Sequence, residues 1–307
     1  MKKILLFTIL ILLIPFFIIG IDNPKEIINK IKYGIYSNKT VKVKNSITNE
    51  ITSVPLEEYV IGVVAGEMPA LFNEEALKAQ AVASRTYVLK RKENNKENYD
   101  VLNNTQNQVY ITYDEMKKKW NNNYDEYLIK IKDAVNKTKG EVILYENNLI
   151  DALFFSTSNG YTENSSDVFS NSLPYLVSVE SKWDQNESPV FSTTKEVLKQ
   201  EFLFNLGFDK NSNIDITNIN KTNTGRVIDM VINGKKVTSK TIQNAFGLKS
   251  TSFLTRVLED KVIFTVTGYG HGVGMSQYGA NGMAKQGYNY QEILKYYYKN
   301  CEIKKIN

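Results

Sequence analysis

A run of uncharged residues near the N-terminus places the strongest constraint on what this chain can become. Residues 4–21 read ILLFTILILLIPFFIIGI and carry no charge over 18 positions. A helix of that length rises about 27 Å, which is enough to cross the hydrocarbon core of a bilayer. Because no small-residue cleavage site follows it, we expect an uncleaved transmembrane signal anchor over residues 1–21 rather than a removable signal peptide.

The charges beside this segment indicate which part of the chain is exported. Lys2 and Lys3 precede it, which favours a cytoplasmic N-terminus. Three lysines between positions 25 and 32 follow it and weaken this asymmetry. We expect residues 22–38 to form a juxtamembrane spacer and residues 39–307 to form one extracytoplasmic domain.

Composition narrows the classes of function. The chain has one cysteine, Cys301, and one histidine, His271, so no disulfide can form within it and most zinc arrangements are excluded. Its net charge is +5, which fits either a solvated lysine-rich surface or attraction to an anionic cell wall. We expect no nucleic-acid partner, because no arginine-rich stripe or aromatic–basic motif is present.

The spacing of apolar residues predicts strands and helices in an irregular order. Alternating or β-branched runs predict strands at 41–43, 51–54, 141–145, 149–155, 227–232, 235–237 and 262–266. Helical spacing and cap residues predict helices at 55–66, 74–92, 125–138, 194–204, from about 275, and at 290–299. Since these elements do not alternate as βαβ units, we expect an α+β fold with two lobes and a substrate groove.

Glu67 is the first candidate for chemistry. It stands in the segment AGEMPA, where the helix that begins at Pro55 is expected to stop and Pro69 prevents its resumption. A carboxylic acid among apolar neighbours has a raised pKa, because desolvation disfavours the anion. A raised pKa is what a general acid needs near neutral pH. Local sequence also leaves open an ordinary surface carboxylate at a helix end.

The alanine-rich helix expected after Asn73 offers further polar side chains. Gln80 and Ser84 share one face of that helix, and Arg85 lies beside them. Arg85 is able to hold a carboxylate or a sugar hydroxyl through its planar fork. A surface or salt-bridged arginine remains the alternative.

A polar segment, STSNG at 156–160, directly follows an apolar run. Ser156, Thr157 and Ser158 offer hydroxyls and exposed backbone at the end of a strand, which suits the binding of sugar hydroxyls. The alternative is an ordinary polar turn.

The most unusual stretch is GYGHGVGMSQYG at 268–279. Its alternate glycines let the backbone approach a ligand closely, although the pattern is not that of a phosphate-binding loop. We expect His271, Ser276 and Gln277 to face whatever this loop contacts. A serine hydrolase lacks its nucleophile-elbow motif here, and a structural hydrogen-bonding role for the histidine stays open.

Four segments together carry a resemblance to a known family. They are VPLEEYVIGVVAGEMPALFNEEALKAQAVASRTYVL (54–89), STSNGYTENSSDVF (156–169), PYLVSVESKWD (174–184) and GYGHGVGMSQYGANGMA (268–284). In this order they resemble the stage II sporulation protein D family, a LytB-like family of endospore-forming bacteria. The resemblance extends from residue 54 to near residue 299 and covers nearly the whole expected extracytoplasmic domain.

The resemblance implies a lytic transglycosylase. Such enzymes cleave the bond between N-acetylmuramic acid and N-acetylglucosamine without water and leave a 1,6-anhydro sugar. Glu67 occupies the family's catalytic glutamate position, and Arg85 matches an arginine that the family needs. One carboxylate suffices for this reaction, because the substrate's own C6 hydroxyl attacks. Glu163 and Asp167 are the fallback candidates for a second carboxylate.

The resemblance also implies a place and partners. The family works at engulfment, in the mother-cell membrane facing the forespore, beside the stage II sporulation proteins P and M. The P protein strips stem peptides, and the D protein then cuts the denuded glycan strand of peptidoglycan.

One departure from some clostridial relatives bears on metal binding. Those relatives carry histidine and cysteine zinc ligands before the QVY segment, whereas residues 98–110 read NYDVLNNTQNQVY here. We therefore expect neither metal nor cofactor. Two other interpretations stay open, namely a non-catalytic wall-binding activator of a partner amidase and a structural member of a membrane complex.

Overall fold

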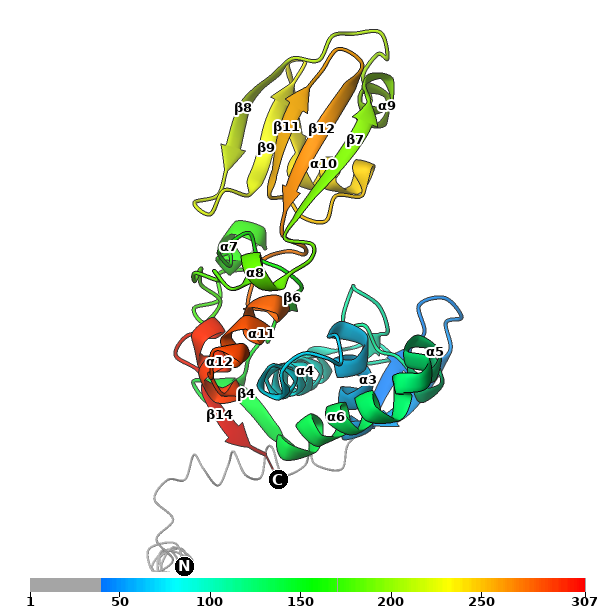
Figure 1. Ribbon diagram of the computed structural model, residues 1–307, viewed down its shortest axis with the longest axis vertical. Coiled ribbons are helices and arrows are strands. Elements are labelled where there is room, and N and C mark those ends of the chain that lie inside the picture. The colour runs from blue at the N-terminus through cyan, green and yellow to red at the C-terminus, as the bar shows by residue number, and fades with distance from the viewer. Residues whose placement is uncertain (1–39, 170, 307) are drawn as a thin grey trace, which may run out of the picture.

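The structure is a computed structural model that describes residues 40–169 and 171–306 (Figure 1). The apolar segment at 4–21 and the spacer at 22–38 lie outside these residues. Among the described residues, no helix combines the length and apolar character needed to cross a membrane. Helices and several small sheets are mixed along the chain, which confirms the expected α+β class.

Two helices form the centre of the first hydrophobic core. α3 (Leu56–Glu67) begins after Pro55, whose fixed φ suits a helix start. α4 (Glu74–Asn94) begins at Asn73, whose side-chain oxygen accepts a hydrogen bond from the backbone N–H of Glu75 at 3.0 Å. The small alanine side chains of α4 are fully buried and allow close packing from several sides, so α4 is the axis of this unit.

The remaining elements of this first unit surround α4. The helices are α5 (Tyr113–Trp120), the 3₁₀ turn η1 (Asn121–Asn123), α6 (Tyr124–Lys137), α11 (Gln277–Lys285) and α12 (Tyr290–Tyr297). One sheet has the order β2-β1-β3, with β1 (Thr40–Lys44), β2 (Ile51–Pro55) and β3 (Val101–Leu102). The other has the order β14-β4-β5, with β4 (Glu141–Tyr145), β5 (Asn148–Leu149) and β14 (Glu302–Lys305). The C-terminal segment thus returns to pack with the N-terminal half of the chain.

A second hydrophobic core lies within residues 197–266. Two antiparallel three-stranded sheets, β11-β12-β7 and β10-β9-β8, enclose it together with two short helices. The elements are β7 (Ser192–Leu198), α9 (Lys199–Asn205), β8 (Ile216–Lys221), β9 (Val227–Ile232), β10 (Lys235–Thr238), α10 (Ser239–Phe246), β11 (Phe253–Val257) and β12 (Lys261–Thr267). Phe246 stacks on Phe202 and on Phe264, each with ring centroids 5.4 Å apart.

The segment that joins the two units explains the alternate glycines. Gly268, Gly270, Gly272 and Gly274 all have positive φ, between 79° and 106°. A Cβ on Gly274 would lie 2.0 Å from the carbonyl oxygen of Leu153. These glycines are therefore required by the left-handed backbone and by close packing inside the protein. Their presence is therefore explained without the expected role of letting the backbone approach a ligand.

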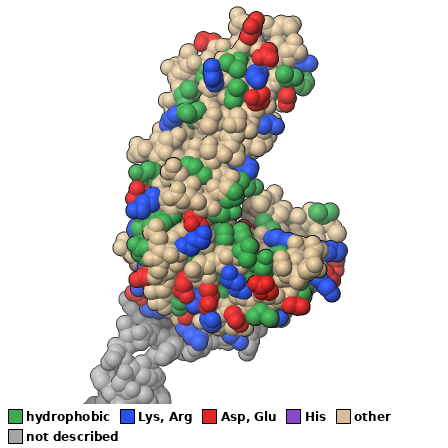
Figure 2. All heavy atoms as spheres, viewed as in Figure 1, with side chains coloured by type: hydrophobic (Ala, Val, Ile, Leu, Met, Phe, Trp, Pro, Cys, Tyr) green, Lys and Arg blue, Asp and Glu red, His purple; other side chains and the backbone are tan. Residues whose placement is uncertain are grey.

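Short elements complete the junction. β6 (Phe154–Phe155) pairs in parallel with β13 (Met275–Ser276), and two short helices, α7 (Ser165–Val168) and α8 (Asp184–Glu187), lie close by. Figure 1 shows the second unit standing as an arm on this junction, with the first unit extending away from its base. The space-filling view is hollowed at the inner corner where the arm meets the helices of the first unit (Figure 2).

Several predicted elements need correction. The helix predicted at 194–204 is wrong in its first half, because residues 192–198 form β7, which pairs along its whole length with β12. The strand predicted at 149–155 is split into β5 and β6. The last two helices are shorter than predicted. α11 starts later, at Gln277, and α12 stops earlier, at Tyr297.

Candidate active site

Glu67 is the last residue of α3, and its carboxylate is held by two donors. The backbone N–H of Val109 donates to Oε1 at 2.7 Å, and Gln277 Nε2 donates to Oε2 at a longer 3.4 Å. Val109 belongs to the segment before α5, and Gln277 begins α11, so three distant parts of the chain meet at this side chain. The Glu67 residue is partly buried, which leaves it accessible from one side.

Burial raises the pKa of Glu67 above its ordinary value of 4.5. The Val109 N–H, the Gln277 amide and the positive charge of Lys119 each lower it by a smaller amount. Lys119 Nζ itself donates to the carbonyl oxygen of Ala65 at 2.9 Å. Among the described residues, Glu67 forms no ion pair within 4.0 Å, so its proton affinity stays raised.

A chain of amides connects Glu67 to α4. Gln277 Nε2 also lies 3.4 Å from Gln80 Oε1, and Gln80 Nε2 donates to Ser84 Oγ at 2.9 Å. The structure therefore brings together three of the residues predicted from sequence, Glu67, Gln80 and Gln277. Gln80 is fully buried and Gln277 nearly so, which suits them to position the carboxylate.

The close packing of residues 109–110 against α3, beside Glu67, requires two glycines of that helix. A Cβ on Gly66 would lie 2.3 Å from the carbonyl oxygen of Val109, and one on Gly62 would lie 2.3 Å from the Tyr110 ring. Tyr59 stacks on Tyr110 with centroids 5.4 Å apart. These contacts press the 109–110 segment onto α3, which is why the Val109 N–H reaches the carboxylate.

Arg85 does not lie with these residues. Its side chain is fully buried, and Nε and Nη2 donate to the two carboxylate oxygens of Glu57 at 2.9 and 2.6 Å. Nη1 donates to the carbonyl oxygen of Glu141 at 3.1 Å. The expected direct contact between Arg85 and a sugar does not fit this placement, because the guanidinium already serves internal partners. Arg85 instead ties α4 to α3 and β4.

The predicted serines lie around a different carboxylate. Asp184 is fully buried and accepts hydrogen bonds from the Ser158 N–H and Oγ, both at 2.9 Å, and from Ser181 Oγ at 2.6 Å. Ser276 Oγ donates to the same carboxylate. Burial raises the pKa of Asp184, and these four donors lower it. Ser158 and Ser276 thus hold the junction together, and their full burial does not fit a direct contact with substrate.

Ser156 and Thr157 differ in exposure. Thr157 is fully buried, and its hydroxyl lies 2.8 Å from that of Ser188, so it too is internal. Ser156 is partly buried, and its carbonyl oxygen accepts from the Tyr278 N–H at 3.1 Å. Ser156 therefore stands beside the start of α11 and is the hydroxyl of the 156–158 segment that can still reach a ligand.

His271 packs between Phe155 and Phe169, with each pair of ring centroids 5.7 Å apart. Its Nδ1 accepts a hydrogen bond from the Val273 N–H at 3.1 Å. Burial, together with the nearby Arg226 guanidinium, lowers the pKa of His271 to about 4, so the ring is neutral near pH 7. These contacts support the structural alternative for the histidine.

Sequence reasoning did not identify several residues near Glu67. Lys119 comes from α5, whose Thr112–Glu115 capping box was a local sign of a helix that the prediction omitted. The Tyr87 hydroxyl lies 3.3 Å from Asn107 Nδ2. Burial raises the pKa of Tyr87, and the charges of Asp151 and Glu67 raise it further, so this tyrosine senses both carboxylates. No short-range pattern pointed to Asp151.

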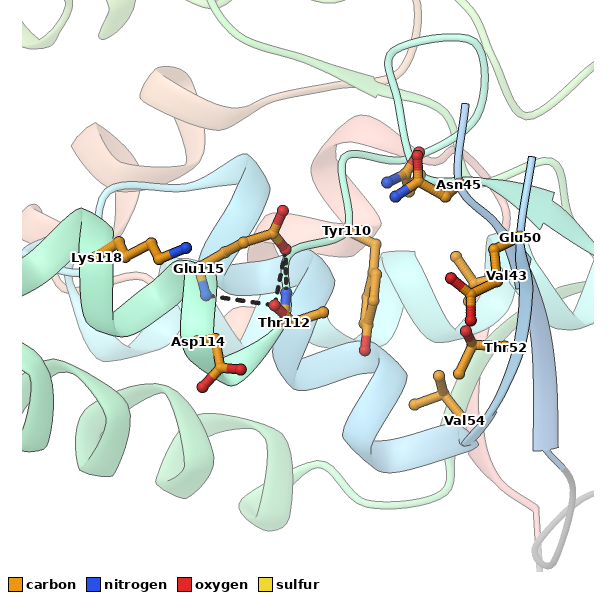
Figure 3. A pocket seen from close by; sticks show the side chains of 11 residues that line it. Val43, Asn45, Glu50, Thr52, Val54, Tyr110, Thr112, Asp114, Glu115 and Lys118 are labelled. Carbon is orange, nitrogen blue, oxygen red and sulfur yellow. Dashed lines mark hydrogen bonds between the residues drawn. The ribbon is translucent and has the colours of Figure 1, made fainter. Parts of the chain in front are cut away.

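A separate pocket of about 330 Å³ lies beside Tyr110 (Figure 3). Figure 3 shows Tyr110 between the hairpin β1–β2 and the start of α5. The residues that line this pocket are Val43, Asn45, Glu50, Thr52, Val54, Asn103, Tyr110, Thr112, Asp114, Glu115 and Lys118. It contains none of the residues predicted for the site. Among the described residues, no three metal-binding side chains come close enough together to hold an ion.

A partly buried glutamate with a raised pKa and two amide neighbours defines a candidate acid–base site within an α+β protein. Residues 44–145, which contain Glu67, match the family described as Stage II sporulation protein. Stage II sporulation protein D of Bacillus subtilis (strain 168) is 43% identical over 270 residues, covering 86% of this chain and 78% of that protein. The protein of the same name from Bacillus amyloliquefaciens is 42% identical over the same length. The chain belongs to the stage II sporulation protein D family.

A more distant similarity extends to a protein named for a different role. The amidase enhancer of Bacillus subtilis (strain 168) is 30% identical over 291 residues, covering 77% of this chain and 39% of that protein. The family thus takes part in sporulation and has a relative that carries an amidase-related name.

Proposed function

We propose that this protein is a peptidoglycan lytic transglycosylase that cuts denuded glycan strands between N-acetylmuramic acid and N-acetylglucosamine. The observation that carries the proposal is Glu67, a partly buried carboxyl whose pKa is raised and which forms no ion pair within the described residues. A raised pKa moves a carboxyl toward the range that a general acid needs near neutral pH.

The proposed reaction uses one carboxyl twice. Glu67 donates its proton to the glycosidic oxygen as the bond to C1 of the muramic residue breaks. The resulting carboxylate then accepts the proton of the C6 hydroxyl as that oxygen bonds to C1, which gives a 1,6-anhydro product and restores the acid. The tethered hydroxyl replaces an activated water, so no second carboxylate is required at hydrolase spacing.

The neighbouring amides support both halves of this cycle. The Val109 N–H and the Gln277 amide each donate to one carboxylate oxygen, at 2.7 and 3.4 Å. They stabilise the anion formed after the first proton transfer and keep the side chain in place. Because the Gln277 contact is long, that oxygen is the one we assign to the proton transferred to the substrate.

The test is product analysis with purified glycan strands that carry no stem peptides. We expect the full-length protein to release fragments with anhydromuramic ends and Glu67→Gln to release none. Fragments with ordinary reducing ends would replace the transglycosylase by a hydrolase. Mass spectrometry distinguishes the two products, since the anhydro end lacks one water.

We also propose where the reaction occurs. The apolar segment at 4–21 would hold the protein in the mother-cell membrane, with the N-terminus cytoplasmic and residues 39–307 in the space facing the forespore. Stage II sporulation proteins P and M would act beside it, with the P protein supplying denuded strands. Pull-down of these two proteins from sporulating cells with tagged full-length protein tests this arrangement.

A second candidate function is non-catalytic activation of an amidase, which the name of the 30% identical relative favours. In that case the junction that contains the 268–274 glycines would be essential and Glu67 would be dispensable. Engulfment in cells that carry Glu67→Gln separates the two functions. Normal engulfment would favour the activator, and blocked engulfment would favour the enzyme.

A further inference from the structure

A second hollow, of about 200 Å³, lies at the C-terminal end of α4. Its lining contains two basic residues, one acidic residue and three neutral polar or aromatic ones: Tyr87, Lys90, Arg91, Asn94, Asn95 and Asp151. Every one of these side chains can donate or accept a hydrogen bond, and the lining has a formal charge of +1, from two cations and one anion. Such a lining suits a polar ligand that carries a negative group.

This hollow is connected to Glu67 by neighbouring residues of one segment. The Val109 N–H donates to Glu67 Oε1 at 2.7 Å, and two residues earlier Asn107 Nδ2 lies 3.3 Å from the Tyr87 hydroxyl. Two residues in an extended backbone span about 7 Å. Glu67 and the hollow therefore both contact the same short segment of chain.

The two cations of the hollow are not equivalent. Arg91 Nε donates to the carbonyl oxygen of Asp100 at 2.9 Å, which fixes the end of α4 against β3. The Lys90 ammonium has no hydrogen-bond or ion-pair partner among the described residues, and the residue is only partly exposed. The next lysine, Lys92, is held by Asp100 Oδ2 at 3.1 Å.

A structural role accounts for Arg91 and Lys92 but not for Lys90. Basic side chains in the last turn of a helix stabilise its dipole, and Arg91 and Lys92 occupy that turn. Lys90 precedes this turn and points to the hollow rather than to a carbonyl or carboxylate of the protein. The Lys90 ammonium is therefore available to pair with an external anion in the hollow.

We propose that Lys90 binds the lactyl carboxylate of a muramic acid residue next to the bond that is cut, with Arg91 and Asn94 completing the subsite. This inference rests on the proposed function, since it takes a denuded glycan strand as the ligand. The stem peptide is attached to muramic acid through an amide at this lactyl carboxyl. Removing the peptide therefore converts a neutral amide into a carboxylate, and Lys90 gives the protein a means of telling the two strands apart.

The proposed discrimination has two physical parts. A carboxylate gains a charge-assisted hydrogen bond to Lys90, whereas an amide at the same position leaves the ammonium unpaired. The stem peptide also adds bulk at the point where the carboxylate would meet Lys90. Asp151, which also lines the hollow, would repel a second carboxylate and accept a sugar hydroxyl.

The experiment compares two versions of one fluorescent glycan strand. In the first the lactyl carboxyls are free, and in the second they are converted to N-methylamides. Binding is measured by fluorescence anisotropy with the full-length protein carrying Glu67→Gln, so that bound strands are not consumed. We expect the free carboxylate strand to bind about tenfold more tightly.

Substitutions at Lys90 decide whether this residue causes the difference. Lys90→Gln should weaken binding of the carboxylate strand by about fivefold to tenfold and leave the amidated strand unchanged, and Lys90→Arg should restore most of the loss. Lys96→Gln is the matched control, because Lys96 is exposed nearby and does not line the hollow. An equal effect of Lys90→Gln on both strands, or no effect, would overturn the subsite.

The same strands separate this proposal from the proposed function. Cleavage of the free carboxylate strand by the protein with Glu67 intact is measured in parallel. If that protein binds with the Lys90-dependent preference but releases no anhydro products, the enzyme is wrong and the subsite stands. If it releases them but Lys90→Gln shows no preference for strand type, the enzyme stands and the subsite is wrong.

Discussion

Two buried glutamates in different regions of the molecule show how differently this fold uses a carboxyl group. Burial raises the pKa of both Glu67, in the first unit, and Glu163, at the base of the arm. Glu163 is fully buried, lies 3.3 Å from Arg226 Nε and is contacted by the Thr222 and Thr224 hydroxyls. Glu67 is partly exposed and has only a backbone N–H and a long amide contact.

The difference teaches which carboxyl can do chemistry. A glutamate that is closed from solvent and committed to an arginine cannot meet a substrate, however unusual its pKa is. Glu163 was a fallback candidate for a second catalytic carboxylate, and this placement removes the support for it. Asp167, the other fallback candidate, is exposed and accepts a hydrogen bond from Asn164 Nδ2 at 2.8 Å, a contact that does not involve Glu67.

The largest expected effect is on the rate of strand cleavage, which should depend on Glu67 but not on Glu163. Glu67→Gln should lower the rate of strand cleavage by about 10²- to 10⁴-fold, which is the usual contribution of a general acid. Glu163→Gln should leave the rate per folded molecule largely unchanged, because it has no path to substrate. The measurement is the release of anhydromuramic fragments per mole of folded protein, with folding checked by circular dichroism.

The opposite result would break the comparison. If Glu163→Gln abolished cleavage in folded protein while Glu67→Gln did not, the acid would lie at the base of the arm. The isosteric Gln is used at both positions so that packing volume is preserved in each variant.

The second effect concerns the two arginines. Arg85 donates to Glu57 through two nitrogens and to the Glu141 carbonyl through a third. Arg85→Met should therefore lower the free energy of unfolding by about 3–5 kcal/mol, because it leaves a carboxylate and a carbonyl without their partner. Arg226→Met should cost less, about 1–2 kcal/mol, since Arg226 Nε meets Glu163 only at 3.3 Å and the buried Glu163 can take up a proton once Arg226 is lost.

Urea unfolding measures this pair of values. Arg256→Met is the control. Arg256 is exposed on β11, so this substitution removes the same charge but leaves no buried partner behind. A larger loss for Arg226→Met than for Arg85→Met would show that the arm, rather than the first unit, depends on its ion pair.

Much of the local structure was predictable because it depends on neighbouring residues. The strands at 41–43 and 51–54, the Asn73 cap and the turn at Asn233–Gly234 are all present, and both turn residues have positive φ, of 48° and 78°. The pairing of β7 with β12 was not predictable in this way. It joins residues 192–198 to a strand more than sixty residues later, and this pairing overrides local helical spacing.

The residues of the site also divide into those that the sequence predicted and those that it did not. Glu67, Gln80 and Gln277 were found from motifs, and the structure brings them together. The role of Arg85 was not evident from sequence, because the same residue type binds a sugar or an internal glutamate, and only the position of Glu57 decides. Asp151 was missed for a related reason, since its relation to Glu67 passes through Tyr87 and no sequence spacing encodes it.

A smaller effect tests the amide contact that Glu163 does not have. Gln277→Leu should lower cleavage about tenfold, the loss expected for one hydrogen bond to a reacting group. Because the Gln277 amide lowers the pKa of Glu67, its removal should also move the alkaline limb of the pH–rate profile to higher pH. The profile is measured beside Gln185→Leu, an exposed glutamine of α8 that serves as the control. An unchanged alkaline limb would contradict the contact.

The smallest effect is a stability difference that depends on pH. The folded-state pKa of Glu67 lies above its ordinary value of 4.5, so the folded protein holds this proton more tightly than the unfolded chain. The free energy of unfolding therefore falls as pH rises from about 4.5 through the raised pKa, and the ionised carboxylate is a net cost at pH 7. Glu67→Gln removes that cost.

We therefore expect Glu67→Gln to be more stable than the unmodified protein at pH 7 and equal to it below pH 4.5. Urea unfolding of both proteins across this range gives the difference directly, because the titration of all other groups cancels. Glu163→Gln should show no such gain at pH 7, although burial raises the pKa of Glu163 as well, because the change leaves the buried Arg226 without its ionic partner. A Glu67→Gln variant that is less stable at pH 7 would mean that the carboxylate is held for structure, and the acid would have to be sought elsewhere.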